Sequence, residues 1–186
     1  MELLAKDIEK HGGRRENIRE TSIDFSPSFT AGVTESFPLA QITYDRFHLI
    51  QMVNKALDEV RRKEAETNVY LKKSRFLWLR NPGDLKQEKK ILLEDLKTKN
   101  VVLAKAYEMK ENLRDLDNQE TRALSEIYLD AWCELVESSG IQPMIQISKT
   151  LRRHRNGILS YIENKITSGV VEGLNSVIQS IKTRAR

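Results

Sequence analysis

Two short strand-like segments near the N-terminus are each joined to an aspartate, and this pattern limits the fold more than any other feature of the chain. The first segment covers residues 18–25 and contains Asp24, and the second covers residues 40–44 and is followed at once by Asp45. Both segments predict a short β-strand. Carboxylates gathered at strand ends are hard oxygen ligands, so the pattern predicts a site for a divalent cation as well as a sheet.

A helix is predicted between the two strands, and a long helical region follows them. Ser26 is a favourable N-cap, Pro27 suits the first helical position and Pro38 ends the segment. After Asp45, apolar residues recur at spacings of three and four over about a hundred residues. The predicted order is therefore strand, helix, strand, a large helical region and a last helix.

Turn signals divide this pattern into individual helices. The expected helices cover residues 2–11, 27–37, 47–65, 85–96, 101–116, 121–137 and 144–162, with a last one that runs from Ser168 to the C-terminus. The segment 69–79 is ambiguous between helix and strand. Trp78 and Trp132 are expected in the core.

Composition narrows the class of protein. Charged residues make up 31% of the 186 residues and aromatic residues only 6%, which suits a soluble, helix-rich domain. No apolar run is long enough to span a bilayer and the N-terminus has no secretory pattern, so we expect no membrane contact and a cytoplasmic location. The single cysteine, Cys133, cannot form an internal disulfide and is expected to be buried.

Positive charge gathers at the C-terminal end of the chain. The whole chain has a net charge of +4, whereas residues 149–186 hold eight basic and two acidic residues, a net charge of +6. This balance indicates a polyanion partner such as nucleic acid, and the alternative is a solvated helix face. The candidate DNA-binding residues are Lys149, Arg152, Arg153, Arg155, Lys182, Arg184 and Arg186.

Each candidate ligand also has a purely structural interpretation. Asp24 and Asp45 could cap the helices that follow them, and for Asp45 this role has equal weight with metal binding. Glu172 lies on a polar stripe of the last helix, which suits either a metal ligand beside a phosphate track or a solvated face. His48 is more typical of a packed helix histidine than of a ligand.

Four motifs carry a resemblance that extends over essentially the whole chain. They are Asp24-Phe25-Ser26-Pro27, Asp45-Arg46-Phe47-His48, Leu151-Arg152-Arg153-His154 and Gly169-Val170-Val171-Glu172-Gly173-Leu174-Asn175. In this order they resemble bacterial insertion-sequence transposases of the ISL-three lineage, within the Asp-Asp-Glu class. Either of the carboxylate motifs alone would be weak, and their pairing is specific.

The resemblance implies a fold. It is α/β and predominantly helical, with a partial ribonuclease-H-like core of two strands plus helices, interrupted by a large all-helical insertion. On this basis residues 1–48 are expected to form part of the catalytic core and residues 49–147 the insertion. Residues 148–186 would be the basic C-terminal part of the core, with the glutamate helix.

The resemblance also implies an activity and a site. Such transposases cut and join DNA with Mg²⁺ (or Mn²⁺), and their partners are the double-stranded DNA of the element ends and of the target. Asp24 matches the second catalytic aspartate and Glu172 the glutamate, with Asp45 as a supporting ligand. His48 and Asn175 are possible accessory residues. Association with the bacterial nucleoid, homo-oligomers or pairing with an intact transposase would follow.

The chain departs from the family pattern in ways that set a second expectation. The strand with the first catalytic aspartate is not found in this sequence, and Ser168 and Arg155 stand where the family commonly has asparagine and tryptophan. We therefore expect a C-terminal part of a transposase, truncated at both ends and inactive alone. The alternative is a non-catalytic fragment that binds DNA or pairs with a transposase.

Overall fold

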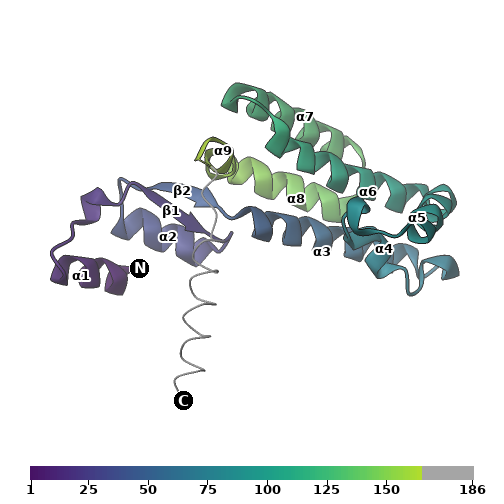
Figure 1. Cartoon of the computed structure of the whole chain (residues 1–186), viewed down its shortest axis with the longest axis horizontal. Helices are drawn as coiled ribbons and strands as arrows, with labels where there is room; N and C mark the ends of the chain where they lie inside the picture. The colour runs from purple at the N-terminus through teal and green to yellow at the C-terminus, as the bar shows by residue number, and fades with distance from the viewer. Residues whose placement is uncertain (165–186) are drawn as a thin grey trace, which may run out of the picture. The chain divides into compact units, whose positions relative to one another are not determined.

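The computed structural model describes residues 1–164, which belong to two units (Figure 1). The sheet unit combines residues 1–49 with the segment that begins at Arg155, and the helical unit covers residues 50–154. The described chain is predominantly helical and contains one small sheet, in agreement with the predicted class. The ribonuclease-H-like core stays a prediction.

The sheet consists of two parallel strands joined by a helix. β1 (Glu20–Ile23) pairs with β2 (Gln41–Tyr44), so that Glu20 lies opposite Gln41 and Ile23 opposite Tyr44. Parallel strands need a crossover connection, and α2 (Pro27–Ser36) supplies it. Both strands and the helix between them are where the sequence predicts them.

The ends of the N-terminal helices follow from capping residues. Ser26 is the N-cap of α2 and Pro27 its first residue, and Phe37 beyond its end is buried. α1 (Glu2–Lys10) is followed by Gly12, whose φ of +83° is the left-handed conformation that glycine adopts without steric cost. A 3-10 turn (Arg15–Asn17) then leads into β1.

The C-terminal helix of the described chain packs closely on β2. At Gly157 in α9 (Arg155–Asn164), an added Cβ would lie 2.5 Å from Cδ2 of Tyr44 and 2.9 Å from the carbonyl oxygen of Ile42. Only glycine permits so close an approach. The Gln41 amide also donates a hydrogen bond to the Ser160 hydroxyl. Two segments far apart in the sequence therefore form one unit.

One helix boundary was predicted wrongly. The continuous helix expected over residues 144–162 is divided at His154 into α8 (Gln142–Arg153) and α9. His154 has φ −104° and ψ 16°, outside the helical region, and its N–H bonds to the Thr150 carbonyl at 3.0 Å. No glycine or proline marks this break, so the apolar spacing alone predicted continuity.

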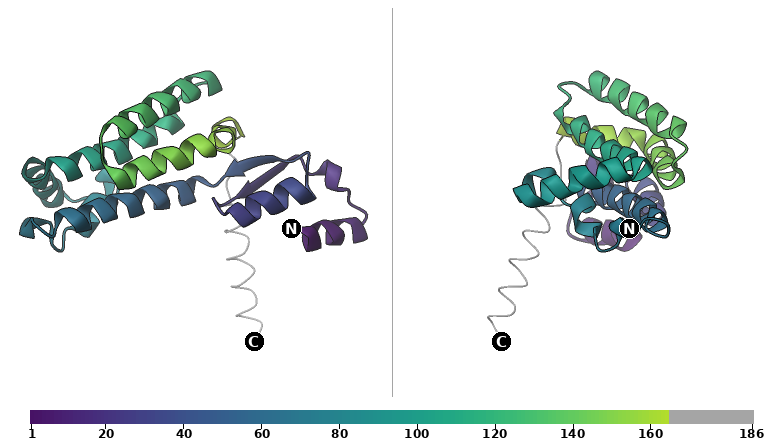
Figure 2. Two further views of the ribbon diagram at one scale, coloured as in Figure 1. Left: turned by 180° about the vertical axis from the view of Figure 1, so that it is seen from behind. Right: turned by 90° about the vertical axis from the view of Figure 1, so that its right-hand side faces the viewer.

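The helical unit is a continuous stretch of chain. Its first helix, α3 (Arg46–Glu64), begins in the sheet unit. The ambiguous segment 69–79 forms a 3-10 turn (Val69–Leu71) and a short helix, α4 (Arg75–Leu79). The remaining elements are a 3-10 turn (Pro82–Asp84), α5 (Gln87–Lys99), α6 (Val101–Arg114), a second 3-10 turn (Asp115–Asn118), α7 (Arg122–Ser138) and α8. Figure 2 shows α6, α7 and α8 running beside one another.

Large side chains fill the core of the helical unit. Trp78 is fully buried, its Nε1 donates to the Ser74 hydroxyl at 3.0 Å, and its ring meets the edge of Tyr107 at 5.8 Å. Lys110, also fully buried, donates from Nζ to the Trp78 carbonyl at 2.8 Å. Burial lowers the pKa of Lys110. The expected burial of Trp78, Trp132 and Cys133 is confirmed. Over residues 1–164, no helix is long and apolar enough to cross a membrane.

Candidate active site

Asp24 and Asp45 take up equivalent positions at the carboxyl ends of two neighbouring parallel strands. β1 ends at Ile23 and β2 at Tyr44, which face each other in the register. The Asp45 N–H continues the ladder by donating to the Ile23 carbonyl at 2.9 Å. Since paired strands lie roughly 4.8 Å apart, the two aspartates follow the strands side by side. The backbone therefore brings these two predicted site residues together.

Asp24 fixes the turn between β1 and α2. Its Oδ1 accepts a hydrogen bond from the Ser26 N–H at 2.9 Å, and the side chain is half-buried. This contact orients the carboxylate at the N-terminal end of α2, where the helix dipole stabilises negative charge. The structure therefore contains the contact that the capping interpretation of Asp24 predicts. This contact involves only one of the two carboxylate oxygens, Oδ1.

Asp45 is more deeply buried and has partners on both oxygens. The residue is 3% exposed. Its Oδ1 accepts from the Phe47 N–H at 2.8 Å, and its Oδ2 lies 3.3 Å from Nδ1 of His48. The first contact caps α3, and the second places a half-exposed imidazole against the carboxylate. Each carboxylate oxygen has two lone pairs and can accept more than one contact.

Aromatic packing supports the strand end next to the aspartates. The Tyr44 ring stacks on Phe25 with centroids 4.6 Å apart and planes 13° apart. The Tyr44 hydroxyl lies 3.2 Å from that of Thr30 in α2, and the same ring touches the backbone of α9 at Gly157. Tyr44 and Gly157 were not predicted as supporting residues. The only signal in the sequence is an isolated glycine inside a helical pattern, which often marks close packing.

The two strand-end aspartates offer oxygen atoms of the kind that divalent cations bind. The backbone register sets Asp24 beside Asp45, and a ring nitrogen of His48 contacts Asp45. No group of three or more histidine, cysteine, aspartate or glutamate side chains suited to a metal occurs within residues 1–164. Glu172 and Asn175 lie outside the described residues, as does the predicted convergence of Glu172 with Asp24.

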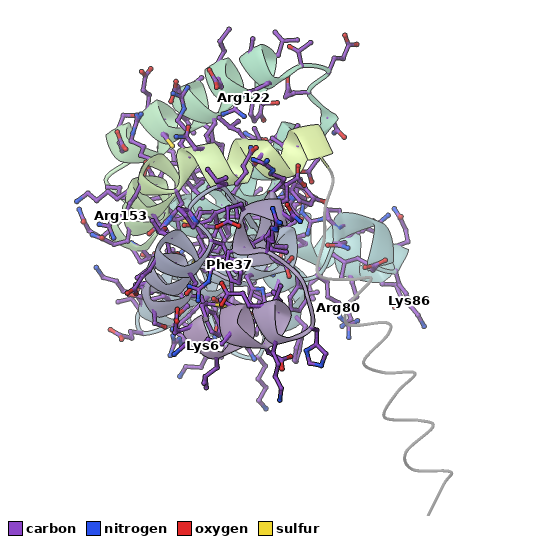
Figure 3. The ribbon with its side chains drawn as sticks, turned by 90° about the vertical axis from the view of Figure 1, so that its left-hand side faces the viewer. Lys6, Phe37, Arg80, Lys86, Arg122 and Arg153 are labelled. Atoms are coloured by element: carbon purple, nitrogen blue, oxygen red, sulfur yellow. The ribbon has the colours of Figure 1, made fainter. Side chains whose placement is uncertain are left out.

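The candidate DNA-binding residues differ in how far their charge is already neutralised. Lys149 and Arg153 are exposed, and Figure 3 shows Arg153 at the surface. Arg152 instead bonds to Glu137 through Nε at 2.8 Å and lies 3.6 Å from Asp130, and the Glu137 contact raises its pKa. Arg155 begins α9. Lys182, Arg184 and Arg186 lie outside the described residues.

Comparison with known proteins assigns a family. A family model described as Transposase (DDE_Tnp_ISL3) matches residues 2–186. The transposase for insertion sequence element IS1001 of Bordetella parapertussis is 28% identical over 93% of this chain and 45% of its own length. The transposase for insertion sequence element IS1557 of Mycobacterium tuberculosis is 23% identical over 89% of this chain and 44% of its own length.

These matches are limited in two respects. The chain spans about half the length of the curated relatives that it matches. No solved structure matches it at a significant level. The family match nevertheless extends over almost the whole sequence and includes both strand-end aspartates. The chain belongs to the ISL3 family of Asp-Asp-Glu transposases.

Proposed function

We propose that Asp24 and Asp45 are ligands for Mg²⁺ (or Mn²⁺) in a site that cuts DNA and transfers its strands during transposition of an insertion sequence. The parallel register, which sets the two aspartates side by side, carries this proposal. Family membership supplies the reaction class. Glu172 would complete the carboxylate set, with Asn175 beside it on the same segment of sequence.

The residues present fit such a cation chemically. Both aspartates offer oxygen ligands, each is held in place by a backbone N–H, and the N-termini of α2 and α3 stabilise their negative charge. A bound divalent cation would activate the attacking oxygen and neutralise charge on the phosphodiester. The chain's own residues orient the ligands. Capping contacts fix both aspartates, and His48 holds the second oxygen of Asp45.

DNA would be held by the basic residues of the segment 149–186. Exposed Lys149 and Arg153 are available for phosphates, whereas Arg152 would first have to leave Glu137. Arg155, Lys182, Arg184 and Arg186 complete the proposed set. Phosphate contacts provide most non-specific affinity and make it depend on salt. The partners are then the double-stranded DNA of the element ends and target, with other transposase subunits.

The 186 residues correspond to less than half of the IS1001 and IS1557 transposases, so turnover is proposed for a whole enzyme and not for this stretch alone. We propose that the isolated chain binds duplex DNA weakly and without sequence preference. We do not expect it to catalyse strand transfer. Magnesium-dependent transfer by the purified chain would show that Asp24, Asp45 and Glu172 form a complete site.

Substitutions that separate capping from metal binding test the proposal. Asparagine keeps the oxygen that accepts the N–H of Ser26 or Phe47 and removes the charge, whereas alanine removes both. We expect Asp24→Asn and Asp45→Asn to keep the melting temperature near that of the wild type. Both should weaken Mn²⁺ binding, followed by calorimetry and by paramagnetic broadening, at least tenfold.

Asp7→Asn is the matched control. Asp7 is an exposed carboxylate of α1, outside the strand ends, and its removal should leave the affinity for Mn²⁺ unchanged. If both asparagine variants bind Mn²⁺ as the wild type does and only the alanine variants lose stability, the aspartates are helix caps and the proposed metal site is wrong.

A further inference from the structure

One stretch of the helical unit carries more net positive charge than the whole chain. Residues 69–90 contain seven basic and two acidic residues, a net charge of +5 against +4 for all 186 residues. None of these residues belongs to the basic C-terminal segment. The basic residues, all exposed, are Lys72, Lys73, Arg75, Arg80, Lys86, Lys89 and Lys90.

Four of these cations line a single surface groove, which we call the α4–α5 groove. It has a volume of about 320 Å³, and Lys72, Lys73, Arg80 and Lys89 lie along its wall. Figure 3 shows Arg80 and the nearby Lys86 pointing away from the ribbon on the same side of the view. Charges from a loop, from the residue that follows a short helix and from a long helix therefore meet at one hollow of the surface.

The fold holds the loop of this groove in an unusual conformation. Lys73 has φ +62°, a value that few residues other than glycine adopt. The adjacent Ser74 is buried, donates to the Leu71 carbonyl at 2.7 Å and accepts from Trp78 Nε1 at 3.0 Å. The core thus anchors the loop and turns Lys72 and Lys73 outward.

The groove cations differ from three other lysines of the same unit because no described carboxylate pairs with them. Lys97 lies 2.9 Å from Glu94, Lys99 reaches Asp95, and Lys110 lies 2.6 Å from Glu111. No salt bridge within residues 1–164 involves Lys72, Lys73, Arg80 or Lys89. Clustered, unneutralised cations repel one another, and a polyanion in the groove would relieve that repulsion.

Two exposed aromatic rings stand among these cations. Tyr70 is 65% exposed and Phe76 is 63% exposed, although apolar rings are usually covered. Both line the groove, and the guanidinium groups of Arg75 and Arg80 lie 5.7 and 5.8 Å from the Phe76 ring centroid. Lys99 Nζ lies over the Tyr70 ring, 5.1 Å from its centroid. Exposed rings among cations are typical of surfaces that bind unpaired bases, because bases stack on rings while phosphates bind the cations.

We propose that the α4–α5 groove binds a single strand of nucleic acid, with phosphates on Lys72, Lys73, Arg80 and Lys89 and an unpaired base against Phe76. Duplex DNA keeps its base faces stacked inside, so the exposed rings favour an unpaired strand. The identity of that strand as DNA rests on the proposed function, whereas the groove itself belongs to the helical unit and Asp24 and Asp45 belong to the sheet unit. Cutting and joining DNA produces ends that such a groove could hold.

Fluorescence anisotropy with the full chain tests the charge part of this inference. The probes are a labelled oligothymidylate of about 20 nucleotides and a duplex of the same length. This length exceeds the number of nucleotides that a typical single-strand site covers. We expect Lys72→Gln, Lys73→Gln and Lys89→Gln together to weaken oligothymidylate binding at least tenfold. The log–log salt slope should fall by roughly 2, at about 0.7 per phosphate contact.

A second triple variant with the same change in net charge is the matched control. Lys6→Gln, Lys10→Gln and Lys63→Gln remove three exposed lysines elsewhere and should change the affinity less than twofold. An equal loss in both triple variants would assign binding to net charge and overturn the inference. So would an unchanged affinity in the groove variant.

The aromatic part is tested separately. Phe76→Ala should weaken oligothymidylate binding roughly tenfold and leave duplex binding unchanged, and Phe76→Tyr should restore it, because stacking needs a ring. Equal effects on strand and duplex would contradict base stacking. The two proposals fail separately: Asp24→Asn tests the metal site without touching the groove, and the groove variants leave both aspartates intact.

Discussion

The sheet unit and the helical unit place their functional groups by different means. In the sheet unit, hydrogen bonds between two strands fix Asp24 and Asp45, and each carboxylate is tied to a backbone N–H. In the helical unit, Lys72 and Lys89 extend from the surface on long flexible stems, without a described partner. Metal ligation needs accurate distances, whereas phosphate binding needs mainly charge, so each arrangement suits the role that we propose for it.

The two units also differ in what limits their stability. The helical unit has a large core around Trp78, while the sheet unit depends on the close fit of Gly157 against Tyr44. Removing side-chain volume should lower the stability of the helical unit, and adding side-chain volume should lower the stability of the sheet unit. Four experiments test this contrast.

The largest effect is expected at Trp78. Trp78→Ala removes a fully buried ring and the hydrogen bond from its Nε1, so the helical unit should lose about 3–5 kcal/mol of unfolding free energy. Urea unfolding followed by the fluorescence of the remaining Trp132 measures it. Ile127→Ala, at a 66% exposed position of α7, should cost less than about 0.5 kcal/mol. Similar losses in the two variants would refute the importance of this core.

Gly157→Ala should be the next most damaging change. The new methyl group would meet the Tyr44 ring and the Ile42 carbonyl, and overpacking of this kind costs about 1–3 kcal/mol. Hydrogen exchange of the β2 amides should become faster, with the helical unit unchanged. At Gly83 an added Cβ meets no atom within 4 Å, so Gly83→Ala is the control. Slow exchange retained in Gly157→Ala would show that α9 does not hold the strand.

A pH effect should distinguish the helical unit. Burial, aided by the charge of Glu111, raises the pKa of Tyr107 to about 12 from 10.0. A raised folded-state pKa means that the stabilisation is complete below pH 10 and is lost as the pH rises towards 12. By pH 11 the unfolding free energy should fall by about 1 kcal/mol.

The tyrosine contribution is isolated with Tyr107→Phe, which cannot ionise. The lowered pKa of Lys110 acts in the opposite direction, because stability then increases with pH, but this residue is present in both proteins. The difference in unfolding free energy between the wild type and Tyr107→Phe should therefore change with pH only as Tyr107 ionises. Parallel stability curves from pH 9 to 11 would contradict the assignment.

The smallest effect concerns Cys133, which serves as a reporter of the helical unit. Its thiol is fully buried in α7, and burial raises its pKa. At pH 8 we expect no reaction with an aromatic disulfide reagent in the native protein and full reaction in urea. Gly157→Ala should leave the thiol protected, whereas Trp78→Ala should expose it sooner. Rapid labelling of the native wild-type protein would show that this core opens readily.

Local signals in the sequence predicted much of the fold. Apolar spacing located the helices, and Ser26, Pro27 and Gly12 predicted helix ends that the structure confirms. Both strands occur where β-branched residues and the flanking turns indicated them. The break at His154 was missed because no glycine or proline marks it, and the segment 69–79 stayed ambiguous because it is too short for periodicity to decide.

The candidate site was predicted in part for the same reason. Asp24 and Asp45 follow strands, so their proximity could be expected once the strands were located, whereas the contact of Asp45 with His48 depends on a helical turn of three residues. The α4–α5 groove could not be foreseen, because its cations come from a loop, from the end of α4 and from α5. Its net charge, however, is visible in the sequence.

The joining of β2 to α9 has a consequence for the order in which the protein folds. Gln41 bonds to Ser160 of α9, 119 residues later, so the ribosome must make the whole helical unit before α9 can pack on β2. At roughly 5–20 residues per second, this delay lasts on the order of 5–25 seconds. The helical unit, a continuous stretch of chain, can form during that time. The strands with the two aspartates acquire their last helix only afterwards, so a nascent chain stalled before Gly157 would have its helical unit and an incomplete candidate active site.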